Sequence, residues 1–183
     1  SGDFHPCQYK IMMVNKLIKK LDQGILVFLD SDAWIQNPLM LSKLIETFPE
    51  DKHGMYSRDP YLKHNTFINS GSFIIKINEY TKNMYNILEK QSREKPRWVW
   101  PRDQFYISNY VHDNKDNFII YKPDILNTPI GKILRHNWSK NFSTCVILKK
   151  HDEFNLENTI DDQPFPNKDV KGYKYRKYDT NYV

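Results

Sequence analysis

The stretch ILVFLDSD at residues 25–32 carries the first structural signal in this sequence. Its five consecutive apolar residues, 25–29, are typical of a strand that is buried on both faces. Asp30 and Asp32 follow at once, so the pattern puts two carboxylates at the carboxyl end of that strand, where open α/β sheets bind ligands. Two carboxylates this close repel each other unless a cation lies between them, and hard oxygen ligands favour Mg²⁺ or Mn²⁺. Ordinary polar turns after strands also carry such acids, so the motif alone leaves both interpretations open.

The rest of the sequence alternates between helical and extended patterns. The predicted helices span 8–22, 39–48, 79–91 and 103–112, and the predicted strands span 25–29, 72–77 and 118–121. Strands that alternate with helices predict an α/β fold with a largely parallel sheet. A loop is expected after Pro49 and two short extended pieces within 125–134. The hydrophobic periodicity fades after about residue 142. We therefore expect one domain over 1–183, in which the segment 142–183 is a wrapping or frayed tail.

The composition excludes several classes of protein. The chain has 183 residues, of which 39% are hydrophobic and 14% aromatic, so it suits a packed core and does not fit a disordered protein. Its longest apolar run falls far short of the roughly 18–20 residues that a membrane-spanning helix needs. Only Cys7 and Cys145 are present, which excludes a disulfide-stapled miniprotein. The net charge of +5 comes from lysines and arginines scattered among acids, so nucleic acid is not the expected partner.

His136 is a candidate third ligand for a metal held by the paired acids. It follows the strand-like run 133–135, and an imidazole fits the remaining protein position of a Mn²⁺ site. Lys140, four residues later, could contact a phosphate as a point charge. A single histidine close to Trp138 is also compatible with a packed or surface position.

Two further segments suit a pocket for a nucleotide sugar. The run NSGS at 69–72 places small and amide-bearing residues at a turn before a strand, which allows close backbone approach, although an ordinary turn has the same composition. Asp103 and Gln104 begin a helix, where Asp103 is either an N-cap or a group that faces the reacting sugar. Trp98 and Trp100 in the preceding loop either offer a flat apolar face to an acceptor sugar or anchor the loop.

Together these pieces resemble the metal-dependent glycosyltransferases of the GT-A fold, most closely glycosyltransferase family 34, the galactosyl, mannosyl and xylosyl transferases. The resemblance covers roughly residues 5–140. Its pieces, in chain order, are His5-Pro6 with Lys10, the apolar strand with Asp30-Ser31-Asp32-Ala33, Asn69-Ser70-Gly71-Ser72-Phe73, Trp100 with Asp103-Gln104, and His136 with Trp138 and Lys140. It implies a Rossmann-like α/β fold with a mixed, mostly parallel sheet flanked by helices. Family members begin with a strand, helix and strand that hold the nucleotide base, and nothing before Ser1 supplies them.

The resemblance also implies a role for each matching residue. Asp30, Asp32 and His136 would hold the metal. The residues that would bind the donor are Lys10, Asp30, Ser31, Asn69, Ser70, Gly71, Trp138 and Lys140, with Lys140 at the diphosphate. Asp103 and Gln104 would be the catalytic residues, and Trp98 and Trp100 would bind the acceptor. The spacing from His136 to Lys140 is short compared with related enzymes.

The activity that this resemblance implies is the transfer of a hexose or pentose from a nucleotide-diphosphate sugar to a glycan or glycoprotein acceptor. A UDP-sugar is the favoured donor, with GDP-mannose as the other option, and Mn²⁺ or Mg²⁺ is the expected cofactor. The implied stereochemistry is retention at the anomeric carbon. The sequence shows no targeting segment, which favours a soluble, cytoplasmic location, although a Golgi luminal domain cut from its anchor would look the same.

Two alternatives stay open at this point. Phosphohydrolases of the haloacid dehalogenase type also carry Asp-x-Asp after an apolar strand. They need Thr or Val two residues after the second Asp, where this chain has Trp34, and a later acidic pair, whereas Asp161-Asp162 lies in a polar segment. A catalytically inactive carbohydrate-binding scaffold would keep the fold, but it would not require acids at both positions 30 and 32.

Overall fold

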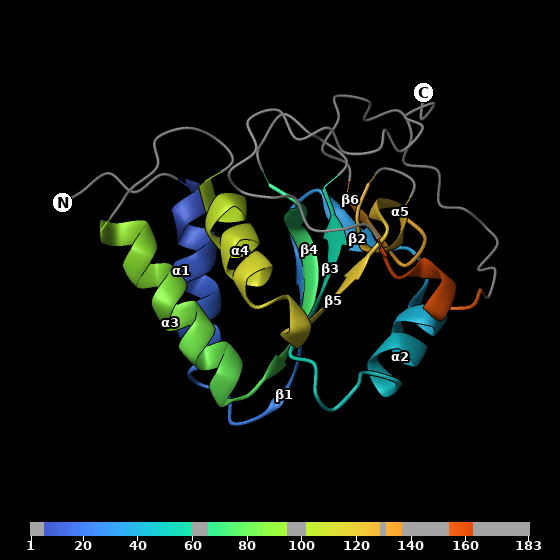
Figure 1. The fold of residues 1–183 in the computed structure, drawn as a ribbon, viewed down its shortest axis with the longest axis horizontal. Coiled ribbons are helices and arrows are strands. Elements are labelled where there is room, and N and C mark those ends of the chain that lie inside the picture. The colour runs from blue at the N-terminus through green and yellow to red at the C-terminus, as the bar shows by residue number, and fades with distance from the viewer. Residues whose placement is uncertain (1–5, 60–65, 95–101, 129–130, 137–153, 163–183) are drawn as a thin grey trace.

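A computed structural model describes residues 6–59, 66–94, 102–128, 131–136 and 154–162 (Figure 1). Its helices are α1 (Pro6–Ile18), α2 (Pro38–Glu46), α3 (Glu79–Glu94), α4 (Arg102–Asp113) and the single turn α5 (Pro123–Leu126), with 3₁₀ turns η2 (Lys115–Asn117) and η4 (Glu157–Thr159). Its strands are β1 (Gly24–Leu29), β2 (Ala33–Ile35), β3 (Gly54–Arg58), β4 (Ile68–Ile77), β5 (Phe118–Tyr121) and β6 (Leu134–His136). Within these ranges, no helix combines the length and apolar character needed to cross a bilayer.

Four strands form one sheet in the order β1-β4-β3-β5, and β2 and β6 form a separate antiparallel ribbon. Helices α1, α3 and α4 cover one face of the sheet, and α2 and α5 cover the other (Figure 1). The predicted α/β class, with a mixed sheet flanked by helices, is confirmed. However, β4 is antiparallel to both β1 and β3, and only β3 and β5 are parallel, so parallel pairs do not predominate among the described strands. A continuous apolar run indicates that a strand is buried on both faces, but it does not indicate whether the neighbouring strands run parallel or antiparallel to it.

Strand β4 is the centre of two hydrophobic cores. Phe73 and Ile75 pack toward α1, α3 and α4, whereas Ile74 packs toward α2 and α5, because successive side chains of a strand point to opposite faces. All three are completely buried. The helices add Ile11, Val14, Ile18, Met84, Leu88, Ile107 and Val111 to the first core, and Met40, Leu41, Leu44, Ile125 and Leu126 to the second. Each main helix therefore buries the apolar stripe that its sequence periodicity predicts.

The predicted helices and strands are all present, with ends shifted by a few residues, but three local predictions were wrong. Residues 69–71, expected to form a turn before a strand, lie inside β4. Strand β3 lies in the stretch after Pro49 that the sequence predicted to be a loop. That prediction failed because Ser57 and Arg58, two of the five residues of the strand, are polar yet buried. The first extended piece expected within 125–134 is instead the end of α5, since Pro123 is well suited to begin a helical turn.

A buried ion pair fixes the end of β3. Nε of Arg58 lies 2.8 Å from Oδ2 of Asp161, and the two side chains are 0% and 1% exposed. The adjacent Ile160 forms an isolated antiparallel bridge with Tyr121 of β5. Residues 160 and 161 are thus packed against the sheet although they belong to a polar stretch of sequence.

We predict that Asp161→Ala lowers the free energy of unfolding by about 3 kcal/mol, because it removes the carboxylate that lies 2.8 Å from Nε of the buried Arg58. Denaturant unfolding measures the change. The matched control is Glu94→Ala, which removes the exposed i,i+4 pair between Lys90 and Glu94 and should cost about 0.5 kcal/mol or less. Equal losses in the two variants would contradict the structural role of the Arg58–Asp161 pair.

Candidate metal centre

Three side chains that can ligate a metal meet where β1 ends. Asp30 and Asp32 belong to the turn that follows β1, and His136 is the last residue of β6. Nε2 of His136 lies 3.1 Å from Oδ1 of Asp32 and 3.8 Å from Oδ2 of Asp30. One ligand atom from each residue lies within 4.8 Å of the other two, a spacing at which the three could hold a single ion.

Backbone pairing brings these residues together from distant parts of the chain. The N–H of Asp30 donates to the carbonyl of Gly71 at 2.8 Å, which attaches the acidic turn to β4. The carbonyl of Asp30 accepts from the N–H of Ala33 at 2.9 Å, so the chain turns directly into β2. In the β2–β6 ribbon Ala33 is paired with His136, and this register sets the histidine beside the acids.

The cluster has the charge and polarity that a divalent cation requires. The side chains of Asp30 and Asp32 are 28% and 41% exposed, whereas His136 is 8% exposed. Burial lowers the pKa of His136 more than the Asp32 and Asp30 carboxylates raise it, which favours the neutral imidazole that can ligate a metal. Burial raises the pKa of Asp30, and the neighbouring Lys10 offsets only part of that rise. Two carboxylates and one imidazole nitrogen fit Mn²⁺ or Mg²⁺.

Gly71 gives the His136 ring the room it needs. A Cβ at position 71 would lie 1.8 Å from Cε1 of His136. Gly71 does not adopt a positive φ, so the requirement for glycine here is one of space and not of backbone conformation. Its N–H donates to Oδ1 of Asn69 at 2.7 Å, which ties the Asn69 side chain to β4. The group that lies close to this glycine in the structure is the His136 ring.

Asn127, which the sequence did not single out, contacts the far side of the His136 ring. Its Oδ1 lies 2.9 Å from Nδ1 of His136, and Asn127 is completely buried. The next residue, Thr128, accepts the His136 N–H through its carbonyl at 3.1 Å. An Asn-Thr pair beyond a short helix has no local sequence pattern that indicates this contact.

Lys10 of α1 connects the acidic turn to α4. Its Nζ lies 2.9 Å from Oδ1 of Asp30 and 2.7 Å from Oδ2 of Asp103, and it donates to the carbonyl of Ser70 at 3.1 Å. Burial alone would lower the pKa of Lys10, but Asp103 and Asp30 outweigh it, so that its pKa lies above the usual value and the ammonium stays charged. Lys10 therefore neutralises carboxylates on two different elements.

Asp103 and Gln104 are both buried in a polar network below this lysine. Ser70 donates through its hydroxyl to Oδ2 of Asp103 at 2.9 Å, and its N–H donates to Oε1 of Gln104 at 3.3 Å. Nε2 of Gln104 donates to Oδ2 of Asp59 at 2.5 Å and to the hydroxyl of Thr66 at 2.7 Å. The first residues of α4 are thus bonded to the strand that supports the metal cluster.

The structure brings most of the predicted site residues into one neighbourhood. Those linked by the contacts above are Lys10, Asp30, Asp32, Asn69, Ser70, Gly71, Asp103, Gln104 and His136. Ser31 is exposed on the acidic turn. The predictions for Trp98, Trp100, Trp138 and Lys140 lie outside the described residues. The polar side chains of this neighbourhood that the sequence did not single out are those of Asp59, Thr66 and Asn127.

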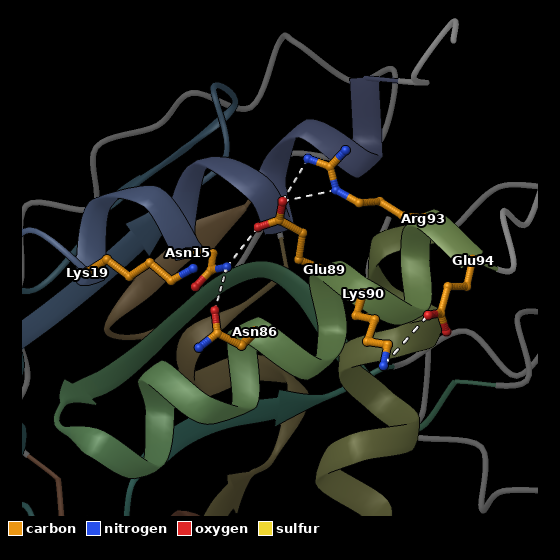
Figure 2. Close-up of a pocket in the computed structure, with 7 residues that line it drawn as sticks. All are labelled: Asn15, Lys19, Asn86, Glu89, Lys90, Arg93 and Glu94. Atoms are coloured by element: carbon orange, nitrogen blue, oxygen red, sulfur yellow. Dashed lines mark hydrogen bonds and ion pairs between the residues drawn. The ribbon is translucent and has the colours of Figure 1, made fainter.

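A separate pocket of about 360 Å³ lies between α1 and α3 (Figure 2). Its lining includes Asn15, Lys19, Glu89 and Arg93, and no member of the metal cluster lines it. Asn15 donates to Oε2 of Glu89 at 2.7 Å, and Glu89 is itself paired with Arg93 (Figure 2). The charged groups here neutralise one another, so this pocket does not compete with the cluster as a metal site.

Comparison with known proteins supports the description of the fold. No family model matches this chain, and no curated protein does. Among solved structures, the chain is similar to the crystal structure of a glycosyltransferase involved in the glycosylation of the major capsid of PBCV-1, with a TM-score of 0.59 and 14% sequence identity. The similarity covers 79% of this chain and 80% of that chain. At this identity the similarity concerns the fold: this chain has the fold of a glycosyltransferase, and membership of family 34 stays a prediction.

Proposed function

We propose that this protein is a metal-dependent glycosyltransferase. The observation that carries the proposal is the Asp30–Asp32–His136 cluster, which lies at the carboxyl end of β1 in a chain with a glycosyltransferase fold. Open α/β sheets bind ligands at this edge, and a nucleotide-diphosphate sugar is a ligand whose phosphates require a cation. The similar solved structure is of a glycosyltransferase involved in the glycosylation of the major capsid of PBCV-1. For this chain we propose a glycan or glycoprotein acceptor.

Asp30, Asp32 and His136 would hold the metal, Mn²⁺ or Mg²⁺. When bound, the metal would supply Lewis-acid stabilisation of the negative charge that develops on the departing diphosphate. The two carboxylates would bind it through oxygen, and the neutral imidazole of His136 would add a nitrogen. The partial exposure of both acids leaves them accessible to a ligand from solvent, whereas the buried His136 is held by protein contacts.

Lys10, Asp103 and Gln104 would organise the reacting end of the site. Lys10 keeps the Asp30 and Asp103 carboxylates close together, so the metal side and the proposed catalytic side are joined by one ammonium. We propose that Asp103 and Gln104 stabilise the oxocarbenium-like sugar and orient the acceptor hydroxyl. In the same proposal Ser31, Asn69, Ser70, Gly71, Trp138 and Lys140 contact the donor, and Trp98 and Trp100 contact the acceptor.

The finer assignment is a UDP-sugar donor, with GDP-mannose as the other option, and retention of anomeric configuration, as in family 34. A phosphohydrolase is disfavoured because Asp161, which would belong to its second acidic pair, is committed to Arg58. Titration calorimetry of UDP-sugars and GDP-mannose, with and without Mn²⁺, tests the proposal. Metal-dependent binding of one nucleotide sugar would identify the donor, and a folded protein that binds none would contradict the proposal.

We predict that Asp32→Ala abolishes Mn²⁺-dependent binding of the nucleotide sugar and lowers sugar transfer at least about 100-fold, because one of three metal ligands is lost. The fold should survive, since Asp32 is 41% exposed and belongs to no core. Calorimetry and a transfer assay measure the two effects, and Asp51→Ala, at an acid 71% exposed, is the control. Wild-type activity in Asp32→Ala would show that the metal assignment is wrong.

We also predict that Gly71→Ala weakens Mn²⁺ binding by about 10-fold or more, because the added methyl group collides with the His136 ring and displaces a ligand. The control is Gly54→Ala in β3, where a Cβ would lie 3.1 Å from Phe118 and Tyr56 and would crowd the core without touching His136. Gly54→Ala should lower the melting temperature but keep the Mn²⁺ affinity. Unchanged affinity in a folded Gly71→Ala would mean that His136 is not a ligand.

A further inference from the structure

The dipeptide Asn127-Thr128 contacts His136 at two points. Oδ1 of Asn127 lies 2.9 Å from Nδ1 of the ring, and the carbonyl of Thr128 accepts the backbone N–H of His136 at 3.1 Å. Both residues are buried, at 0% and 4% exposure. The short segment between α5 and β6 therefore holds both the ring and the backbone of His136 in place.

The amide oxygen of Asn127 favours a proton on Nδ1 of the His136 ring. A neutral imidazole has one N–H, and a carbonyl oxygen beside Nδ1 can only accept. The hydrogen on Nδ1 is then held by Oδ1 of Asn127. Nε2 lies 3.1 Å from Oδ1 of Asp32, itself an acceptor, so Nε2 offers its lone pair when a cation takes the place of a proton between the two. A donor in place of Oδ1 would bond to a lone pair on Nδ1 and put the hydrogen on Nε2, where it would block metal ligation.

The polar contacts of Asn127 indicate a role beyond packing. Its Nδ2 is buried and has no hydrogen-bond partner in the described part of the chain. A buried amide with an unpaired donor is costly, and an apolar side chain such as leucine would avoid that cost. The bond from His136 to Oδ1 is thus the polar contact that accounts for an asparagine at this position.

The backbone at Thr128 gives a second, independent observation. Thr128 has φ of 74°, a left-handed conformation that is a genuine outlier for a β-branched residue. Its carbonyl accepts from both Gly131 and His136. The backbone around Gly131 is equally tight, since a Cβ there would lie 1.9 Å from the carbonyl oxygen of Leu134. Strained backbone of this kind persists where the surrounding structure compensates for its cost, and it is concentrated at functional sites.

We propose that Asn127 is a positioning residue that fixes His136 in its Nδ1–H tautomer and so makes Nε2 the metal ligand, with the strained Thr128 turn setting the place of the ring. This inference rests on the proposed metal site. Partners that bond the second ring nitrogen of a metal-ligating histidine are a general device for orienting the ligand and typically change metal affinity by about 10–100-fold.

Three variants and two measurements test the inference. Nitrogen-15 NMR of the metal-free protein reports which nitrogen of His136 is protonated, and titration calorimetry reports the affinity for Mn²⁺. Wild-type protein should carry a proton on Nδ1 of His136. Asn127→Leu should populate the Nε2–H tautomer and bind Mn²⁺ about 10–100-fold more weakly, whereas Asn127→Asp, which keeps an acceptor oxygen, should stay near the wild-type affinity.

Asn15→Leu is the matched control, because Asn15 is also a buried asparagine, 2% exposed, with bonds to Asn86 and Glu89 (Figure 2). It should lose stability and keep its Mn²⁺ affinity and the His136 tautomer. If wild-type protein binds no Mn²⁺, the proposed function fails, and the tautomer can still be read. If wild-type protein binds Mn²⁺ but shows the Nε2–H tautomer, or if Asn127→Leu is folded and binds Mn²⁺ as tightly, the role of Asn127 is overturned. Should Asn127→Leu not fold, the wild-type tautomer and Asn127→Asp decide the question.

Discussion

The contact of the His136 ring with the backbone of Gly71 is the constraint on which the candidate centre depends. It lets β6 lie close enough to β4 for an imidazole to reach the acidic turn after β1. Gly71 also accepts the N–H of Asp30, so the same residue positions both sides of the cluster. β4 can provide this support because it is held between β1 and β3 and packed on both faces. The rigidity of the core is thereby passed on to the site.

Electrostatics explain the other half of the arrangement. Asp30, Asp32 and Asp103 gather three carboxylates at one end of the sheet, and only Lys10 lies between two of them in the described contacts. Lys10 balances the inner pair and leaves the outer acid, Asp32, facing His136 and solvent. Negative charge is thus compensated inside the protein and left uncompensated at its surface, which is the polarity that attracts a cation. Uncharged side chains at these positions would serve packing better, so the charges favour a role in ligand binding.

The sequence predicted those parts of this picture that depend on local patterns. The apolar run before Asp30 indicated β1, and the chemistry of the acids pointed to His136 as a companion far along the chain. It could not predict β3, because the polar Arg58 is buried there in an ion pair with the distant Asp161, nor could it predict the antiparallel course of β4. Asn127 was missed because its role depends on a contact with His136, nine residues further along the chain, which no local sequence pattern indicates. Gly71 was selected for a close approach by a ligand, and the approaching group is a side chain of the protein itself.

The β2–β6 ribbon has a consequence for how the protein folds. It pairs Ala33 with a residue about a hundred positions further along the chain, and each strand has only three residues. Closing so long a loop costs conformational entropy, and the pairing of six residues provides little stabilisation against that cost. The ribbon should therefore form after the main sheet and open before it. The halves of the candidate centre would then separate while the cores around β4 stay intact. Hydrogen exchange would then find weakly protected amides in the β2–β6 ribbon, directly beside the side chains of the candidate centre.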